Sequence, residues 1–281
     1  MNIKRKPDWL KIKLPEGEDY SRINTIVKQH KLHTICSSGN CPNMGDCWGR
    51  GTATFMILGN ICTRACKFCN VPTGKPLPVD TNEPQNLAET IKLMNLKHSV
   101  LTSVDRDDLP DGGAKIWAES ITKIKELNPQ TTLETLIPDF DGNTELLDIV
   151  IAAKPEVISH NLETTRRLTP LIRTKAKYET SLKVLKHIAN SGIVAKTGIM
   201  LGLGETREEI LQTMDDALAA GCKVFTIGQY LQPTRQHAEV QEYINPEIFE
   251  EYKKIGIEKG FRAIESSPLV RSSYKAEKHI F

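Results

Sequence analysis

The sequence predicts an α/β fold, a partial TIM-like barrel of six βα units with an extension at each end. Three observations lead to this prediction. The chain has 281 residues, a length that one α/β barrel can fill without splitting into several domains. Apolar β-like runs alternate with amphipathic helical patterns along most of it. Hydrophobic residues make up 39% and charged residues 26%, and no low-complexity tract interrupts the alternation, as is typical of a globular protein.

Each strand is predicted from a short apolar run that ends at turn residues. In chain order, these runs lie near 52–58, 98–104, 131–136, 156–159, 193–200 and 223–228. The helices are predicted from apolar residues that recur with helical spacing, at 83–97, 112–127, 143–153, 176–190, 205–220 and 246–259. Asn82, Gly192, Gly204 and Gly221 mark their starts and stops. This alternation calls for a parallel sheet with right-handed crossovers, and six units favour a partial barrel.

Within this frame the chain divides into three segments. Residues 51–260 form the barrel, residues 1–50 an N-terminal extension and residues 261–281 a C-terminal extension. Active-site residues of parallel barrels gather on loops after the carboxyl ends of strands. The polar segments after the predicted strands are 62–69, 105–108, 161–163, 202–205 and 232–233. We expect them to face one central cavity.

The net charge and the hydropathy of the sequence argue against two classes of partner, nucleic acids and membranes. Lys and Arg number 37 against 35 Asp and Glu, which leaves a formal net charge of +2 and no electrostatic sign of nucleic-acid binding. No window approaches the apolar length of a membrane span. We therefore expect a cytoplasmic protein without a nucleic-acid or membrane partner.

Six of the seven cysteines lie between residues 36 and 69, and only Cys222 stands apart. Disulfides are not expected in a reducing compartment, so metal binding is the leading use of such a cluster. Cys62, Cys66 and Cys69, here called the loop triplet, have the spacing C-x3-C-x2-C. Three thiolates on one loop can hold three corners of a [4Fe–4S] cluster and leave the fourth iron open to a small chelating molecule.

A second group, here called the N-terminal triplet, has the spacing C-x4-C-x5-C and consists of Cys36, Cys41 and Cys47. It is also one ligand short of a complete cluster site. Structural zinc usually uses two C-x2-C-like pairs, which neither triplet matches, although the nearby His33 keeps a zinc site open. A ferredoxin normally supplies four thiolates per cluster within a short chain, unlike this one. The isolated Cys222 is interpreted as a small buried residue.

The segments around both triplets resemble the lipoyl synthase family of radical S-adenosylmethionine (SAM) enzymes. The segment CPNMGDCWGRGTATFMILGNICTRACKFCNV, which joins the triplets, carries the resemblance. It continues through RKPDWL at 5–10, TSVDRDD at 102–108, SHNLETT at 159–165, GIMLGLGET at 198–206, GQYLQPT at 228–234 and RSSYKA at 271–276. It thus covers essentially the whole chain, and it implies the partial (βα)6 barrel of the radical SAM type.

The resemblance implies two [4Fe–4S] clusters and SAM as cofactors. The cluster on the loop triplet would cleave SAM to a 5′-deoxyadenosyl radical, while the auxiliary cluster on the N-terminal triplet would give up sulfide. It further implies that Ser273, the second serine of RSSY, is the fourth ligand of the auxiliary cluster. The implied reaction inserts two sulfur atoms at C6 and C8 of a protein-bound octanoyl chain, giving the lipoyl cofactor.

The candidate SAM contacts are Asn161, Glu163, Arg173, Gly202 and Glu205. The loop that begins at 159 is polar enough to bind the ends of SAM through charge-assisted hydrogen bonds, although a solvated loop would look similar. Arg173 suits the SAM carboxylate because arginine pairs well with planar anions. Gly202 would let the backbone approach the cofactor, or serve simply as a loop glycine.

The resemblance also implies partners. The substrates would be octanoylated lipoyl carrier domains, of a 2-oxoacid dehydrogenase acyltransferase subunit or of the glycine-cleavage carrier protein. An electron donor such as flavodoxin or ferredoxin and an iron–sulfur carrier protein would support turnover. The nearest alternative is another two-cluster radical SAM enzyme, such as a methylthiotransferase acting on RNA or protein, but no RNA-binding domain is visible after residue 240.

Overall fold

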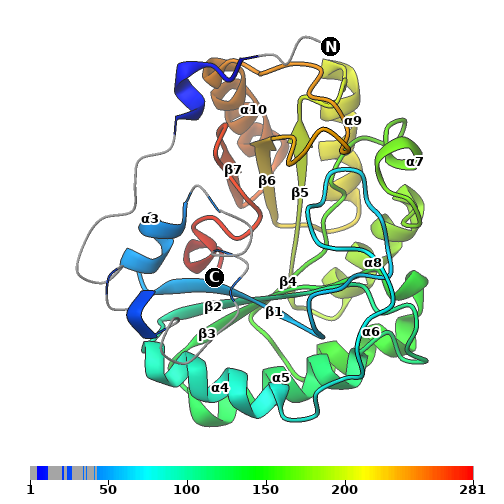
Figure 1. Ribbon diagram of the computed structural model, residues 1–281. Helices are drawn as coiled ribbons and strands as arrows, with labels where there is room; N and C mark the ends of the chain where they lie inside the picture. The colour runs from blue at the N-terminus through cyan, green and yellow to red at the C-terminus, as the bar shows by residue number, and fades with distance from the viewer. Residues whose placement is uncertain are drawn as a thin grey trace.

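One parallel sheet organises the chain. The computed structural model describes residues 5–11, 21, 24–26, 34, 36, 41 and 43–280. Within this part, seven strands pair in the order β1-β2-β3-β4-β5-β6-β7, and every neighbouring pair is parallel. Spatial order that follows chain order, with a helix between each two successive strands, is the arrangement of a partial α/β barrel (Figure 1).

All the predicted strands and helices are present, with ends that differ by a few residues. The strands are β1 Thr52–Ile57, β2 His98–Ser103, β3 Thr132–Leu136, β4 Val157–Ser159, β5 Val194–Leu201, β6 Val224–Gln229 and β7 Ala263–Ser266. The helices are α3 Met44–Gly49, α4 Glu83–Met94, α5 Ala114–Leu127, α6 Thr144–Ala152, α7 Thr169–Ile172, α8 Tyr178–Asn190, α9 Arg207–Ala219 and α10 Pro246–Lys259. Single 3-10 turns form η1 Asp8–Leu10, η2 Phe140–Gly142 and η3 Ala276–Lys278.

The seventh strand and the short helices α3 and α7 were not predicted. Strand β7 has the sequence AIES, in which Ile264 is the only large apolar residue, so periodicity gives no signal. It pairs with β6 from Val224↔Ala263 to Ile227↔Ser266 and lies within the segment 261–281 that we predicted as a C-terminal extension. The sheet therefore continues one strand beyond the predicted barrel.

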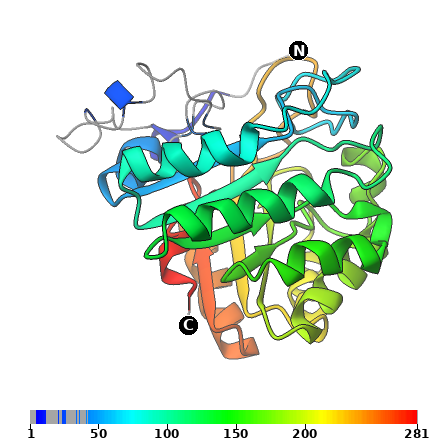
Figure 2. The ribbon, with the colours of Figure 1, turned by 90° about the horizontal axis from the view of Figure 1, so that it is seen from below.

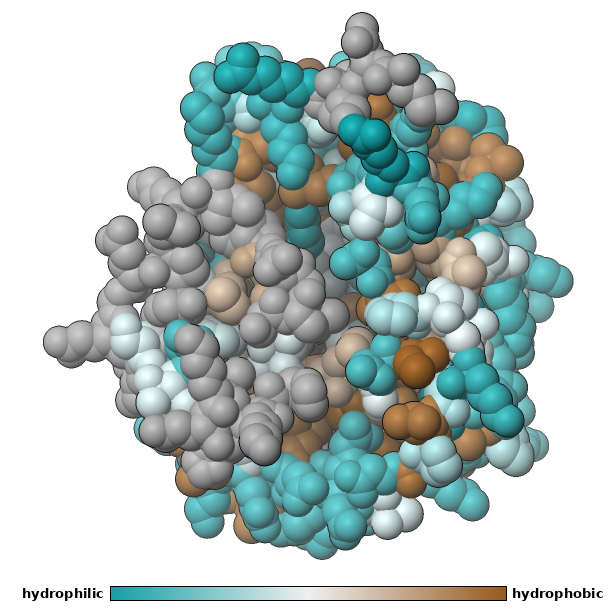
Figure 3. Space-filling model, in the orientation of Figure 1, coloured by the Kyte–Doolittle hydropathy of each residue, from teal (hydrophilic) through white to brown (hydrophobic). Residues whose placement is uncertain are grey.

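Amphipathic helices cover the outer face of the sheet. Helices α4, α5 and α6 lie side by side in Figure 2, coloured cyan to green. Each buries an apolar stripe, which in α5 includes Trp117, Ile121 and Ile124, and turns its polar side outward. The teal lower edge in Figure 3 corresponds to α4. No described helix combines the length and apolar character that a bilayer-spanning segment needs.

Side-chain caps fix where several helices begin, and thereby the lengths of the loops before them. Thr206 and Glu209 form a reciprocal capping box at the start of α9. Asn143 and Asn245 accept hydrogen bonds at the starts of α6 and α10. A cap of this kind stabilises its helix by about 1 kcal/mol. The loop between β5 and α9 is consequently short, because it begins where β5 ends at Leu201 and stops at the capping residue Thr206.

Candidate active site

The loop triplet lies on the loop after β1, at the carboxyl edge of the sheet as predicted. Cys62 donates its backbone N–H to the carbonyl of Pro72 at 2.9 Å and accepts from the N–H of Gly74 at 3.1 Å. Cys69 donates its N–H to the carbonyl of Cys66 at 3.1 Å. These hydrogen bonds hold the two ends of the loop together. The three sulfur atoms are close enough that negative charge on Cys62 or Cys66 raises the pKa of Cys69.

The surroundings of the loop triplet suit metal-bound thiolates. Burial raises the pKa of all three thiols, that of Cys69 to about 11, so that they carry protons until a metal displaces them. The Sγ atom of Cys62 accepts backbone N–H groups from Arg64 at 3.4 Å and from Asp105 at 3.3 Å. Soft thiolates supported by N–H donors fit an iron–sulfur cluster.

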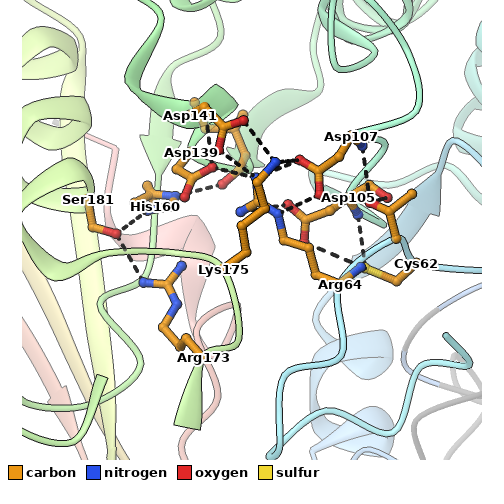
Figure 4. A network of polar contacts seen from close by, with 12 residues as sticks. Cys62, Arg64, Asp105, Asp107, Asp139, Asp141, His160, Arg173, Lys175 and Ser181 are labelled. Atoms are coloured by element: carbon orange, nitrogen blue, oxygen red, sulfur yellow. Dashed lines mark hydrogen bonds and ion pairs between the residues drawn. The ribbon is translucent and has the colours of Figure 1, made fainter. Parts of the chain in front are cut away.

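A cluster of aspartates anchors the loop triplet to its neighbours through Arg64 (Figure 4). The guanidinium of Arg64 lies 2.8 Å from carboxylate oxygens of Asp107 and Asp139, 3.4 Å from Asp105 and 3.5 Å from Asp141. Only 4% of the Arg64 side chain is exposed, and its charge lowers the pKa of Asp139. Because these aspartates follow β2 and β3, the network ties three strand ends together.

Arg173 is oriented from behind by a chain of hydrogen bonds, also shown in Figure 4. Its Nη1 donates to Ser181 Oγ at 3.0 Å, and His160 Nε2 lies 2.9 Å from the same oxygen. His160 Nδ1 lies 2.9 Å from the carbonyl of Ile137. Since a carbonyl only accepts, we place the imidazole proton on Nδ1, so that Nε2 accepts from the Ser181 hydroxyl. Burial lowers the pKa of His160 to about 4, which keeps the ring neutral.

Three of the predicted SAM contacts meet beside the loop triplet. Burial raises the pKa of Cys66, the charge of Arg173 opposes this rise, and the Glu163 carboxylate adds to the rise for both Cys66 and Cys69. Burial raises the pKa of Glu163, while Arg173 and a hydrogen bond from Asn161 oppose the rise. The buried Oδ1 of Asn161 has no hydrogen-bond partner within the described residues. A cation, a carboxylate and an open acceptor therefore surround one side of the loop triplet.

The other two predicted contacts, Gly202 and Glu205, shape the loop after β5. Gly202 has φ +102°, and a Cβ there would lie 2.2 Å from Nε2 of Gln229, so only glycine fits. The Glu205 carboxylate accepts the N–H groups of Gly202 at 2.9 Å and Leu203 at 3.0 Å, and the hydroxyl of Thr164 at 3.2 Å. Glu205 thereby joins its loop to the loop that carries Glu163, and its carboxylate is already occupied by donors of the protein.

The N-terminal triplet is also brought together, around the start of α3. Cys41 donates its backbone N–H to the carbonyl of Cys36 at 3.0 Å. Burial, together with the charges of Cys36 and Cys41, raises the pKa of Cys47 to about 12, against the lowering effect of Arg50. His33, the residue that keeps a zinc site open, lies outside the described residues. In the described part of the chain, no three His, Cys, Asp or Glu side chains are grouped as a single metal ion requires.

The C-terminal segment folds back onto this triplet, as Figure 1 shows for the red chain beside α3. The Nδ2 of Asn43 donates to the carbonyl of Leu269 at 2.6 Å, and the positive charge of Arg271 acts on Cys41. A Cβ on Gly228 would lie 2.2 Å from the carbonyl oxygen of Val270, so glycine permits this close approach. The half-buried Ser273 lies within the segment that these contacts hold.

Several residues of the site were not predicted. No motif or periodicity points to His160, Arg64, Asp139, Ser181 or Lys175, the last of which pairs with Asp107 at 2.8 Å and Asp141 at 2.9 Å. A partial signal exists for Arg64, which stands between two cysteines of the loop triplet. The other four are ordinary polar residues of loops or helices, and only the fold shows that they meet. Cys222 is buried, as predicted.

Two family models match the sequence. Residues 56–217 match the radical SAM superfamily, and residues 1–41 match the N-terminal domain of lipoyl synthase. A relative named lipoyl synthase from Phocaeicola vulgatus is 64% identical over 280 residues, covering 100% of this chain and 99% of the relative. Another lipoyl synthase, from Treponema denticola, is 64% identical over 276 residues, covering 98% and 95%.

Solved structures of the same fold are more distant in sequence. Methylornithine synthase has a TM-score of 0.59 at 12% identity, with 86% of this chain and 81% of that chain covered. Streptococcus suis SuiB bound to S-adenosylmethionine also has a TM-score of 0.59 at 12% identity, with 87% and 61% covered. At this identity the likeness shows the fold alone.

Proposed function

Because this chain belongs to the lipoyl synthase family of the radical SAM superfamily, we propose that its two cysteine triplets divide the family's reaction between them. The loop triplet holds the [4Fe–4S] cluster that cleaves SAM. The N-terminal triplet and Ser273 hold the auxiliary [4Fe–4S] cluster, whose sulfide is inserted at C6 and C8 of a protein-bound octanoyl chain. We keep the division into segments 1–50, 51–260 and 261–281 as part of this proposal.

The two triplets have different neighbouring residues, and this difference is the main support for the proposal. The loop triplet lies among Arg173, Glu163 and Asn161, which offer a cation, a carboxylate and an amide. The N-terminal triplet instead lies against the C-terminal segment with Ser273. Two sites that each lack one cysteine thus have unlike neighbours to complete them.

Beside the loop triplet, the protein's task is to bind and orient SAM. The guanidinium of Arg173 suits the methionine carboxylate, and Glu163 suits the ammonium group, because opposite charges pair strongly where water is excluded. The free Oδ1 of Asn161 can accept one further hydrogen bond from the ligand. Gly202 and Glu205 contribute through the fixed shape of their loop, and thus as supporting residues. When bound, the cluster and SAM supply the 5′-deoxyadenosyl radical.

Beside the N-terminal triplet, the protein's task is to hold a cluster that must later be dismantled. A serine oxygen is a harder ligand than a thiolate and binds iron of such a cluster less firmly. Ser273 therefore suits a position from which a ligand has to leave. Arg271, whose charge reaches Cys41, stabilises the negative charge of the thiolates.

For partners, we propose octanoylated lipoyl carrier domains as substrates. Flavodoxin or ferredoxin would supply electrons, and an iron–sulfur carrier protein would rebuild the auxiliary cluster. These follow from the chemistry, because each turnover consumes reducing equivalents and sulfide.

The test is a single-turnover reaction with anaerobically reconstituted protein. SAM, a reductant and an octanoyl-lysine peptide are supplied, and the peptide is weighed by mass spectrometry. We expect a product with two added sulfur atoms and about eight irons per chain, because two [4Fe–4S] clusters are bound. A peptide without sulfur, or about four irons per chain, would contradict the proposal. Transfer of a methylthio group instead would favour the methylthiotransferase alternative.

A further inference from the structure

A buried ion pair lies within the sheet. Lys196 of β5 places Nζ 2.8 Å from each carboxylate oxygen of Glu134 of β3, and both side chains are 0% exposed. Ser159 of β4, the strand between them, donates its hydroxyl to Glu134 at 2.6 Å. Buried charges of this kind are tolerated when they are paired and hydrogen-bonded.

The third partner of the pair comes from the C-terminal segment. The Nζ of Lys196 lies 3.1 Å from Nδ1 of His279, which is itself 0% exposed. An ammonium group only donates, so Nδ1 is the acceptor and the ring proton lies on Nε2. Burial and the charge of Lys196 keep the imidazole neutral by lowering its pKa. The interior of the barrel therefore holds the segment around His279 through a charge-assisted hydrogen bond.

The segment between Ser273 and His279 is short and forms tight turns. His279 donates its N–H to the carbonyl of Ala276 at 3.0 Å, and Ala276 donates to the carbonyl of Ser273 at 3.4 Å. Between them, Glu277 forms an ion pair with Arg50 Nε at 2.9 Å. Arg50 directly follows the helix that carries Cys47. Two successive turns thus connect the backbone of His279 to the backbone of Ser273.

We propose that His279 is a positioning residue for the auxiliary cluster, and that its bond to the buried Lys196–Glu134 pair holds Ser273 against the N-terminal triplet. This inference rests on the proposed function, in which Ser273 is the fourth ligand. A weak oxygen ligand in a turn outside the strands and helices of the barrel would otherwise have to be ordered each time it binds, at a cost in conformational entropy. Anchoring the segment inside the barrel removes that cost while leaving the Ser273–iron bond itself weak.

The test measures how firmly the auxiliary cluster is held. In a background with Cys62, Cys66 and Cys69 all changed to Ala, iron reports the auxiliary cluster alone, and its release to a ferrous chelator is followed by absorbance. We expect His279→Leu to release iron on the order of ten-fold faster, as loss of a hydrogen bond to a charged group implies. His279→Asn, which keeps an acceptor near Nδ1, should restore slow release. The exposed neighbour Lys278 provides the control, Lys278→Ala, which should behave as the parent.

Two further variants separate positioning from a general loss of stability. Glu134→Met/Lys196→Met removes both buried charges together, which spares the barrel an unpaired charge, and it should release iron as fast as His279→Leu. Combined with Ser273→Ala, the His279→Leu change should accelerate release no further, because it acts through Ser273.

Iron release from both His279→Leu and the double Met variant at the parental rate would overturn the inference, and so would a full additional acceleration in the Ser273→Ala background. If the parent without the loop triplet binds no iron at all, the proposed function itself fails, which is a distinguishable result. With all cysteines present, His279→Leu should still cleave SAM at the normal rate.

Discussion

Ser181 accepts a hydrogen bond from Arg173 at 3.0 Å, and it thereby links the proposed SAM-binding arginine to the buried His160. Neither serine nor histidine faces the loop triplet directly. Their effect on the cofactor is to fix the direction of the Arg173 guanidinium, which also donates to the carbonyl of Asn161 at 3.2 Å. The orientation of the cation is thus set by Ser181 of helix α8 together with the Asn161 carbonyl of its own loop.

We therefore expect Ser181→Ala to weaken SAM binding. Loss of one hydrogen bond to a charged group costs about 1.5–3 kcal/mol, so the Kd for SAM should rise on the order of ten-fold or more. Equilibrium binding of SAM to reconstituted protein measures the change. Ser181→Thr keeps the hydroxyl and should bind normally, as should Ser191→Ala, a control in the exposed residue that follows α8. An unchanged Kd in Ser181→Ala would refute this role.

The division of labour between the triplets predicts two different defects. Cys66→Ala should abolish formation of 5′-deoxyadenosine, because the cluster that binds SAM loses a ligand. Cys41→Ala should still form 5′-deoxyadenosine in the presence of reductant but add no sulfur to the octanoyl peptide. Chromatography of the nucleoside and mass spectrometry of the peptide measure both outcomes in the same sample. Equal loss of SAM cleavage in the two variants would contradict the assignment.

We expect replacement of the buried Arg64 to lower the stability of the protein. Its buried guanidinium pairs with the buried Asp139, so Arg64→Met leaves the Asp139 carboxylate without its charged partner, whereas Asp107 keeps Lys175. Breaking a buried pair in this way costs about 3–5 kcal/mol. Urea unfolding should show the loss. In Arg167→Met, the control, the lost ion pair involves a side chain that is 53% exposed, and the free energy of unfolding should change by less than about 1 kcal/mol. Equal effects would contradict the role of burial.

Because His160 is buried and neutral, we expect the free energy of unfolding to fall on acidification. Its pKa is about 4 in the fold, below the ordinary value of 6.5 for histidine, so the unfolded chain binds the proton more readily. The stabilisation is complete above pH 6.5 and is lost as the pH falls from there towards 4. Between about pH 7.5 and 5.5, the free energy of unfolding should fall by about 1 kcal/mol from this residue. Urea unfolding of cluster-free protein measures it, and His160→Asn should have a shallower pH dependence. An identical slope in both proteins would argue against a neutral buried ring.

The sequence by itself determined the elements and the two triplets. Strands and helices follow from local periodicity, and the capping residues that end them are close in sequence, so β1 to β6 and their helices could be predicted. Cysteines a few residues apart also remain neighbours in any fold, which is why both triplets were visible. Strand β7 was not predicted, because four residues with only one large apolar side chain show no hydrophobic periodicity.

Only the tertiary structure decided which distant groups meet. Arg64 forms ion pairs with aspartates that follow β2 and β3. Arg173 donates a hydrogen bond to Ser181 on α8, and His279 accepts one from Lys196 on β5. These contacts join residues far apart in sequence, and each depends on strand register and on how the loops close over the sheet. A polar side chain carries no local signal of the partner that burial will give it, because its pairing is settled by the whole fold.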